Sequence, residues 1–361
     1  MWFLITAIVV LVIFLLLIRN LYGEDLRQYD SADLSATFYR PTPSYKYPQA
    51  LELIESIKEP ISFIKPSKYL YALRKNIDRL GDVELDCVII PVATSFQGHR
   101  IMGEWVINKN SDVNKRLLYI HGGGFAVGSP KSHRVVTERL ARELGVAVFA
   151  VSYAMIPDGK RVKGIQDCRY AYQWLLANNP NNPQVCHRIY VAGDSAGGNL
   201  TLALIGWLKQ QKIRQVDAAI AICPCIDSTF SYGSLSYNAK TDFLLHPFLG
   251  KFHHFPQFVL LIWVAILFRM NPRDPQVSPI FANLSGLPPI LIQASDTEMM
   301  VDDSRRYTNK ARSQGSNVRL QTWSNMLHVW HLFDLEEADE AYIEIGKFVA
   351  QCEYELEKVA S

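Results

Sequence analysis

The sequence lacks an excess of either charge. Its 361 residues include 37 lysines and arginines against 35 aspartates and glutamates, a formal net charge of +2. Because nucleic-acid binding depends on basic residues that neutralise phosphates, this balance argues against a nucleic acid as the partner. The phosphate-binding patterns G-x-x-x-x-G-K-[ST] and G-x-G-x-x-G are also absent. The chain is 49% hydrophobic, which indicates a globular protein with a small, apolar partner.

Cysteines are few, and no pair has the C-x-x-C spacing of a zinc knuckle or a thioredoxin-type centre. We therefore expect no metal site and no cofactor, and interpret most cysteines as core thiols. One disulfide is left open, although Cys223 and Cys225 are too close in sequence to bridge easily. The six residues are Cys87, Cys168, Cys186, Cys223, Cys225 and Cys352.

One long apolar run carries no charge, at residues 1–18 (MWFLITAIVVLVIFLLLI). As a helix it would be about 27 Å long, close to the thickness of a bilayer's hydrocarbon core. No charged segment precedes it and no A-x-A-like cleavage site follows, which favours an uncleaved membrane anchor at residues 1–19 over a signal peptide. Arg19 and Arg27 follow the run, and the positive-inside rule taken literally places the rest of the chain in the cytoplasm.

From about residue 87, short β-rich runs alternate with helical stretches, a pattern typical of a mostly parallel sheet covered by helices on both faces. Helical periodicity occurs at residues 132–144, 164–177, 196–210 and 302–313. The eight predicted strands are residues 87–92, 100–107, 116–120, 146–151, 188–192, 218–223, 290–294 and 317–323.

Two regions do not fit this alternation: residues 20–84, rich in Tyr, Pro and Lys, and an insertion at about 228–275. We expect them to form a cap over a domain that spans residues 85–361. The insertion contains a fourteen-residue apolar run, 255–268, which is short for a bilayer span. A lid helix that contacts the membrane interface and a buried core helix are both compatible with it.

A serine in a glycine-rich turn follows the strand predicted at 188–192. Residues 193–198 read GDSAGG, the pattern of a nucleophile elbow, in which a sharp strand-to-helix turn exposes the serine hydroxyl. The flanking glycines suit so tight a bend. The pattern G-x-S-x-G is common by chance, and its strand and helix context makes Ser195 the predicted nucleophile.

A second glycine run, His121, Gly122, Gly123 and Gly124, follows the strand predicted at 116–120. Backbone N–H groups of such a loop can approach a developing negative charge, and the residue after the nucleophile adds a further donor. We predict that Gly123, Gly124 and Ala196 form an oxyanion hole. His121 is interpreted as a structural hydrogen-bonding residue rather than a base.

A nucleophilic serine needs a base and an orienting carboxylate, in the order serine, acid, histidine for this type of elbow. Asp296 follows the strand predicted at 290–294 and is the predicted acid, with Glu298 as a minor rival and Asp227 as the alternative on another strand end. His328 follows the last strand and is the predicted base. The first turn of a helix accounts for Asp302 and Asp303.

These motifs, together with residues 278–296, resemble the hormone-sensitive lipase family of α/β-hydrolases over roughly residues 85–355. The resemblance implies an α/β-hydrolase fold with a cap built from the N-terminal region and the insertion. With the apolar N-terminus, the chain is most similar to membrane-anchored arylacetamide deacetylases and neutral cholesterol ester hydrolases. Their catalytic domains face the lumen, which conflicts with the literal reading of Arg19 and Arg27.

The sequence departs from the family in two places. Where the family often has an arginine and then a Pro-Glu pair, residues 153–158 read YAMIPD, and the residues after His328 lack a frequent glycine. Both differences bear on the shape of the pocket.

The resemblance implies a carboxylic-ester hydrolase that acts on small apolar esters through an acyl-enzyme. The membrane is a further partner, through the N-terminal helix and, as a second candidate contact, the lid. An amidase or transacylase would use the same residues. A non-catalytic receptor, as in plant gibberellin receptors that lack the histidine, is disfavoured because His328 is present.

Overall fold

The computed structural model describes residues 66–360 continuously, together with 24–31, 36–39 and the single positions 2, 5, 6, 8, 12, 52 and 55. Most of the predicted anchor and much of the predicted N-terminal cap region therefore lie outside the described residues. Among the described residues, no helix is long and apolar enough to cross a membrane.

A nine-stranded sheet lies at the centre of the described structure, in the order β1-β9-β8-β7-β6-β4-β5-β3-β2. β3 pairs antiparallel with β2 and β5, and the other neighbouring strands are parallel. The strands are β1 (Thr37–Tyr39), β2 (Val88–Phe96), β3 (His99–Ile107), β4 (Asp112–Ile120), β5 (Val146–Val151), β6 (Arg188–Asp194), β7 (Ala218–Ile222), β8 (Ile290–Ser295) and β9 (Val318–Trp323).

Each of the eight predicted strands corresponds to one of β2 to β9, but the predicted strand count was wrong because β1 adds a ninth. β1 has three residues in a Tyr- and Pro-rich region without alternating polarity, so no local pattern marks it. Tertiary contacts hold it at the edge of the sheet: the Tyr39 ring stacks on Trp323 at a centroid distance of 4.3 Å, and the Tyr39 hydroxyl donates a hydrogen bond to Glu344.

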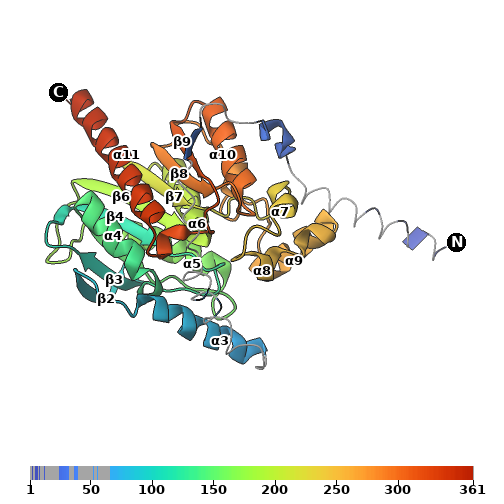
Figure 1. The fold of residues 1–361 in the computed structure, drawn as a ribbon, viewed down its shortest axis with the longest axis horizontal. Helices are drawn as coiled ribbons and strands as arrows, with labels where there is room; N and C mark the ends of the chain where they lie inside the picture. Colours follow the sequence, from blue (N-terminus) through green and yellow to red (C-terminus); the bar gives the residue numbers. More distant parts are fainter. Residues whose placement is uncertain are drawn as a thin grey trace.

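Helices cover both faces of the sheet (Figure 1). In β4, Leu117 and Tyr119 belong to the core under one helical layer, and Leu118 and Ile120 to the core under the other. This period-two alternation buries both faces of β4, as expected for a central strand in the parallel part of a sheet. One layer contains α4 (Arg134–Leu144) and α11 (Glu336–Ala360), and the other α5 (Arg161–Leu175), α6 (Ala196–Gln211) and α10 (Val301–Ser313).

The segment between β7 and β8 contains three short helices that lie beside the main body in Figure 1. They are α7 (Ser234–Tyr237), α8 (His246–Leu249) and α9 (Gln257–Phe268). α9 is the helix predicted from the apolar run 255–268. On the N-terminal side, α3 (Pro66–Ile77) packs outside the sheet. We call residues 228–275 the lid below.

Candidate active site

Ser195 lies between β6 and α6, in the predicted elbow. Its backbone has φ 50° and ψ −115°, an unfavourable conformation for a residue with a side chain. Glycines permit the tight turn: a Cβ on Gly197 would lie 1.8 Å from the Ile120 carbonyl oxygen, and one on Gly193 2.5 Å from that of Gly197. The turn brings Ser195 Oγ to 3.0 Å from Nε2 of His328.

His328 lies in the loop after β9 and is 2% exposed. Its two ring nitrogens face two different partners. Nε2 faces Ser195 Oγ, whereas Nδ1 lies 2.6 Å from a carboxylate oxygen of Glu298. A hydroxyl, an imidazole and a carboxylate are therefore connected in series, the arrangement that activates a serine nucleophile.

The prediction that Asp296 orients the histidine was wrong, and its minor rival Glu298 occupies that position. The backbone of Asp296 still pairs with β9, through its N–H and the Trp323 carbonyl at 3.0 Å. Its carboxylate accepts hydrogen bonds from Ser324 Oγ at 3.1 Å and from the Asn325 N–H at 2.7 Å.

Glu298 lies in the turn that follows β8. In addition to its contact with His328, its carboxylate accepts a hydrogen bond from the Ser295 N–H at 3.1 Å. Glu298 is fully buried, whereas Asp296 is partly exposed. Asp296 was the predicted acid because it lies closer to the strand end in the sequence. In the structure, the turn directs the carboxylate of Glu298 toward His328 and that of Asp296 toward Ser324 and Asn325.

The alternative acid Asp227 and a second histidine after β9, His331, have partners elsewhere. Asp227 accepts hydrogen bonds from Thr229 and Ser231 rather than from the histidine. His331 is buried, and its Nε2 lies 2.7 Å from Gln293 Oε1. Burial lowers the pKa of His331 to about 3, so this ring is neutral and structural.

Burial and the neighbouring carboxylate act in opposite directions on His328. Burial lowers the pKa of the imidazole, but the hydrogen bond and the negative charge of Glu298 outweigh it, so that the pKa of His328 is raised above its ordinary value. Glu298 thus favours the imidazolium that forms when the histidine takes a proton.

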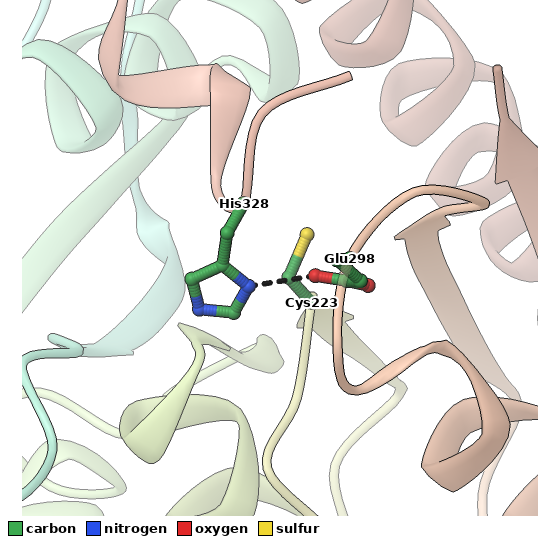
Figure 2. Close-up of side chains that lie close together, drawn as sticks. All are labelled: Cys223, Glu298 and His328. Carbon is green, nitrogen blue, oxygen red and sulfur yellow. Dashed lines mark hydrogen bonds and ion pairs between the residues drawn. The ribbon is translucent and has the colours of Figure 1, made fainter. Parts of the chain in front are cut away.

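Cys223, at the end of β7, completes a compact cluster with Glu298 and His328 (Figure 2). Potential ligand atoms of the three residues lie within 4.8 Å of one another. A cation could in principle use this donor set, but Glu298 and His328 already bond each other, and His328 faces Ser195. Burial and the charge of Glu298 raise the pKa of the Cys223 thiol, which keeps it protonated. All six cysteines are free thiols.

The glycine run after β4 lies beside the elbow. Asp194 joins the two segments, because its carboxylate accepts the Gly122 N–H at 2.9 Å. Gly123 has φ 105° and Gly124 φ 60°, conformations that favour glycine. Within the described part of the chain, and apart from its own sequence neighbours, no heavy atom lies within 4 Å of the position that a Cβ on Gly124 would occupy. The described residues therefore leave open space beside Gly124.

Asp194 is a structural residue that no sequence motif marks as functional. It also accepts a hydrogen bond from the Tyr119 hydroxyl at 2.6 Å, and it lies 3.3 Å from His133 Nε2. Burial raises the pKa of this carboxyl, but His133 and Tyr119 outweigh that effect and bring it to about 2. The variable position of the G-x-S-x-G pattern therefore carries a buried anion that holds the glycine loop.

His121 has the structural role that the sequence predicts. Its Nδ1 lies 2.8 Å from the Gly122 carbonyl oxygen, and its ring stacks on Tyr153 at a centroid distance of 4.4 Å. Burial lowers the pKa of His121 to about 3, so the ring is neutral and cannot supply a charge to the site.

Known proteins share this arrangement of sequence and fold. The profile of a family described as alpha/beta hydrolase fold matches residues 117–332. An acetyl-hydrolase of Streptomyces hygroscopicus is 33% identical over 68% of this chain and 78% of its own. An esterase of Acinetobacter venetianus is 31% identical over 67% of this chain and 77% of its own.

Solved structures lead to the same family. An esterase from the bacterial hormone-sensitive lipase family superposes with a TM-score of 0.70 at 29% identity, over 84% of this chain and 98% of its own. The chain therefore belongs to the hormone-sensitive lipase family of α/β-hydrolases and is a carboxylic-ester hydrolase of the serine type.

Proposed function

We propose that Ser195, His328 and Glu298 are the catalytic triad of this esterase. The observation that carries the proposal is the continuous contact from Ser195 Oγ through both ring nitrogens of His328 to Glu298, at 3.0 and 2.6 Å. The three residues come from the ends of β6, β9 and β8, which meet at one edge of the sheet. Glu298 takes the role that the sequence suggested for Asp296.

In the first half of the reaction, Ser195 Oγ attacks the carbonyl carbon of the ester while His328 Nε2 takes the hydroxyl proton. The tetrahedral intermediate collapses when His328 returns this proton to the leaving alcohol, which leaves the acyl group on Ser195. In the second half, water attacks the acyl-enzyme and gives its proton to His328. Ser195 then leaves with that proton, and the carboxylic acid is released.

Backbone N–H groups of Gly123, Gly124 and Ala196 are the proposed donors to the oxyanion. The open space beside Gly124 and the hold of Asp194 on Gly122 support this assignment. Each such donor typically contributes about 3 kcal/mol of transition-state stabilisation.

The substrates we propose are esters with an apolar acyl or alcohol group. A cavity of about 260 Å³ lies in the lid region, and its lining combines aromatic and aliphatic side chains with the polar Ser231, Ser236, His253 and Gln257. Its apolar part suits an apolar group, and Ser195 and His328 are not among its lining residues.

Membrane anchoring through residues 1–19 is part of the proposal and rests on their uncharged apolar sequence. The lid supports a second contact. Residues 243–273 contain no aspartate or glutamate but include Lys251, Arg269 and Arg273, a charge pattern that suits an anionic lipid surface. The apolar N-terminus fits the membrane-anchored arylacetamide deacetylase and neutral cholesterol ester hydrolase types, whose catalytic domains are lumenal, whereas anionic lipids are typical of the cytoplasmic leaflet, the side that the positive-inside rule favours.

Turnover of a p-nitrophenyl ester series by the full chain tests the catalytic assignment. Ser195→Ala should abolish turnover, because no other group can form the acyl-enzyme. A fluorophosphonate should label the wild-type serine and label His328→Ala far more slowly. Normal turnover by Ser195→Ala protein would refute the mechanism.

A further inference from the structure

Arg74, on α3, reaches the segment that follows the glycine run. Its Nε donates to the Ala126 carbonyl oxygen at 2.7 Å, and one terminal nitrogen donates to the Ile156 carbonyl oxygen at 3.0 Å. The other terminal nitrogen pairs with Asp158, which also accepts the Tyr71 hydroxyl at 2.8 Å. A single guanidinium therefore ties together α3, the end of the glycine turn and the loop after β5.

The carbonyl that Arg74 binds belongs to the same tight turn as the proposed oxyanion donors. The N–H groups of Ala126 and Val127 both lie close to the Gly123 carbonyl oxygen, at 3.1 and 2.9 Å. Phe125, between Gly124 and Ala126, has φ 63°, which is strained for a residue with a side chain. A turn that contains such strain keeps its shape only when its surroundings hold it.

Three further contacts hold the turn that contains Phe125. The Ile156 N–H donates to the Phe125 carbonyl oxygen at 2.9 Å, so Arg74 binds one partner of this backbone pair, Ile156, and the residue that follows the other, Ala126. The guanidinium of Arg161 lies 3.9 Å from the centre of the Phe125 ring. Asp194 fixes the start of the segment at Gly122, and Arg74 fixes its end.

We propose that Arg74 is a positioning residue for the oxyanion hole, so that the N-terminal helix α3 contributes to catalysis as well as to the cover of the site. The inference rests on the proposed function, since it takes Gly123 and Gly124 as the oxyanion donors. Backbone donors stabilise a transition state only when they are held close to the required geometry. Residues 153–158, in the loop after β5, read YAMIPD without the arginine that the family often has, and Arg74 supplies a guanidinium to this loop from α3.

Arg214 offers a matched control far from the site. It donates to two backbone carbonyls, of Cys186 at 2.6 Å and of His187 at 2.7 Å, and lies 3.8 Å from Asp217. This pattern repeats that of Arg74, but Cys186 and His187 directly precede β6, whereas Ser195 follows it. Loss of Arg214 therefore removes the same kinds of interaction without touching the glycine turn.

The experiment compares Arg74→Met and Arg214→Met in the full chain, with a short p-nitrophenyl ester as substrate. For Arg74→Met we expect kcat to fall about 10- to 100-fold, because the donors are displaced. The inhibition constant of a trifluoromethyl ketone, whose adduct with the serine places an oxyanion in the hole, should rise in parallel. Ground-state binding of the ester, measured in a Ser195→Ala background, should change little. Arg74→Lys should give an intermediate loss.

The results separate positioning from general stability. If Arg214→Met lowers kcat and trifluoromethyl ketone affinity as much as Arg74→Met at the same loss of melting temperature, the inference is overturned. It is also overturned if Arg74→Met weakens only ground-state binding. If Ser195→Ala protein still turns over the ester, the proposed function fails, and this outcome is distinct from either result for Arg74.

Discussion

At the residue scale, the roles of two nearby carboxylates depend on where each one points. Asp296 and Glu298 are two positions apart after the same strand, and both have the chemistry to orient an imidazole. Asp296 accepts hydrogen bonds from Ser324 and Asn325 and thereby stabilises the loop that precedes His328. Glu298 bonds the histidine itself. The proposed roles, triad acid for Glu298 and loop support for Asp296, predict sharply different effects when the two residues are substituted.

Glu298→Gln is expected to reduce kcat by about 10³- to 10⁴-fold, since a neutral amide cannot stabilise the imidazolium or select the correct tautomer. Asp296→Asn should lose less than about 10-fold, because its amide oxygen can still accept a hydrogen bond. Steady-state kinetics on one ester gives both values, and circular dichroism controls for folding. The reverse order of the two losses would contradict the triad.

The pH profile should reflect the raised pKa of His328. Only the neutral imidazole can accept the proton of Ser195, so activity is lost as pH falls through the pKa of this group. Because Glu298 raises that pKa above about 6.5, the acidic limb of kcat/KM should have its midpoint above pH 6.5. A midpoint below pH 6 would contradict the strong Glu298 contact.

At the element scale, α9 has two apolar faces with different surroundings. Leu260, Leu261 and Val264 are buried against the protein. On the other side, Val259, Trp263 and Ile266 are 36%, 45% and 70% exposed, and their spacing places them along one stripe of the helix. An exposed apolar stripe that includes a tryptophan suits contact with a lipid surface.

Trp263→Ser together with Ile266→Ser should therefore leave the hydrolysis of a soluble short ester unchanged, with only a small loss of melting temperature from the contact of the Trp263 ring with Phe252, at a centroid distance of 5.2 Å. In a chain deleted for residues 1–19, the same pair should reduce co-sedimentation with anionic vesicles several-fold. Val264→Ala is the buried counterpart, and it should lower stability by about 1 kcal/mol or more. Unchanged vesicle binding by the double variant would show that the lid does not contact the membrane.

At the scale of the whole molecule, the sheet brings together groups that are far apart in the sequence. Ser195, Cys223, Glu298 and His328 follow four different strands, yet they form one buried cluster. The order of the strands makes this possible, because β6, β7, β8 and β9 are consecutive neighbours in the sheet. Their carboxyl ends therefore share one edge.

Local patterns in the chain were enough to predict the strands β2 to β9 and to single out the elbow serine, the glycine loop and the histidine after the last strand as candidates. Each of these has a local signature, such as a buried β-rich run, a glycine where no Cβ fits, or a histidine after a strand. β1, the contact of Glu298 rather than Asp296 with His328, and the contacts of Arg74 became visible only once the chain was folded. These features depend on contacts between residues that are far apart in the sequence or on the direction of a turn. A short local sequence pattern encodes neither of them.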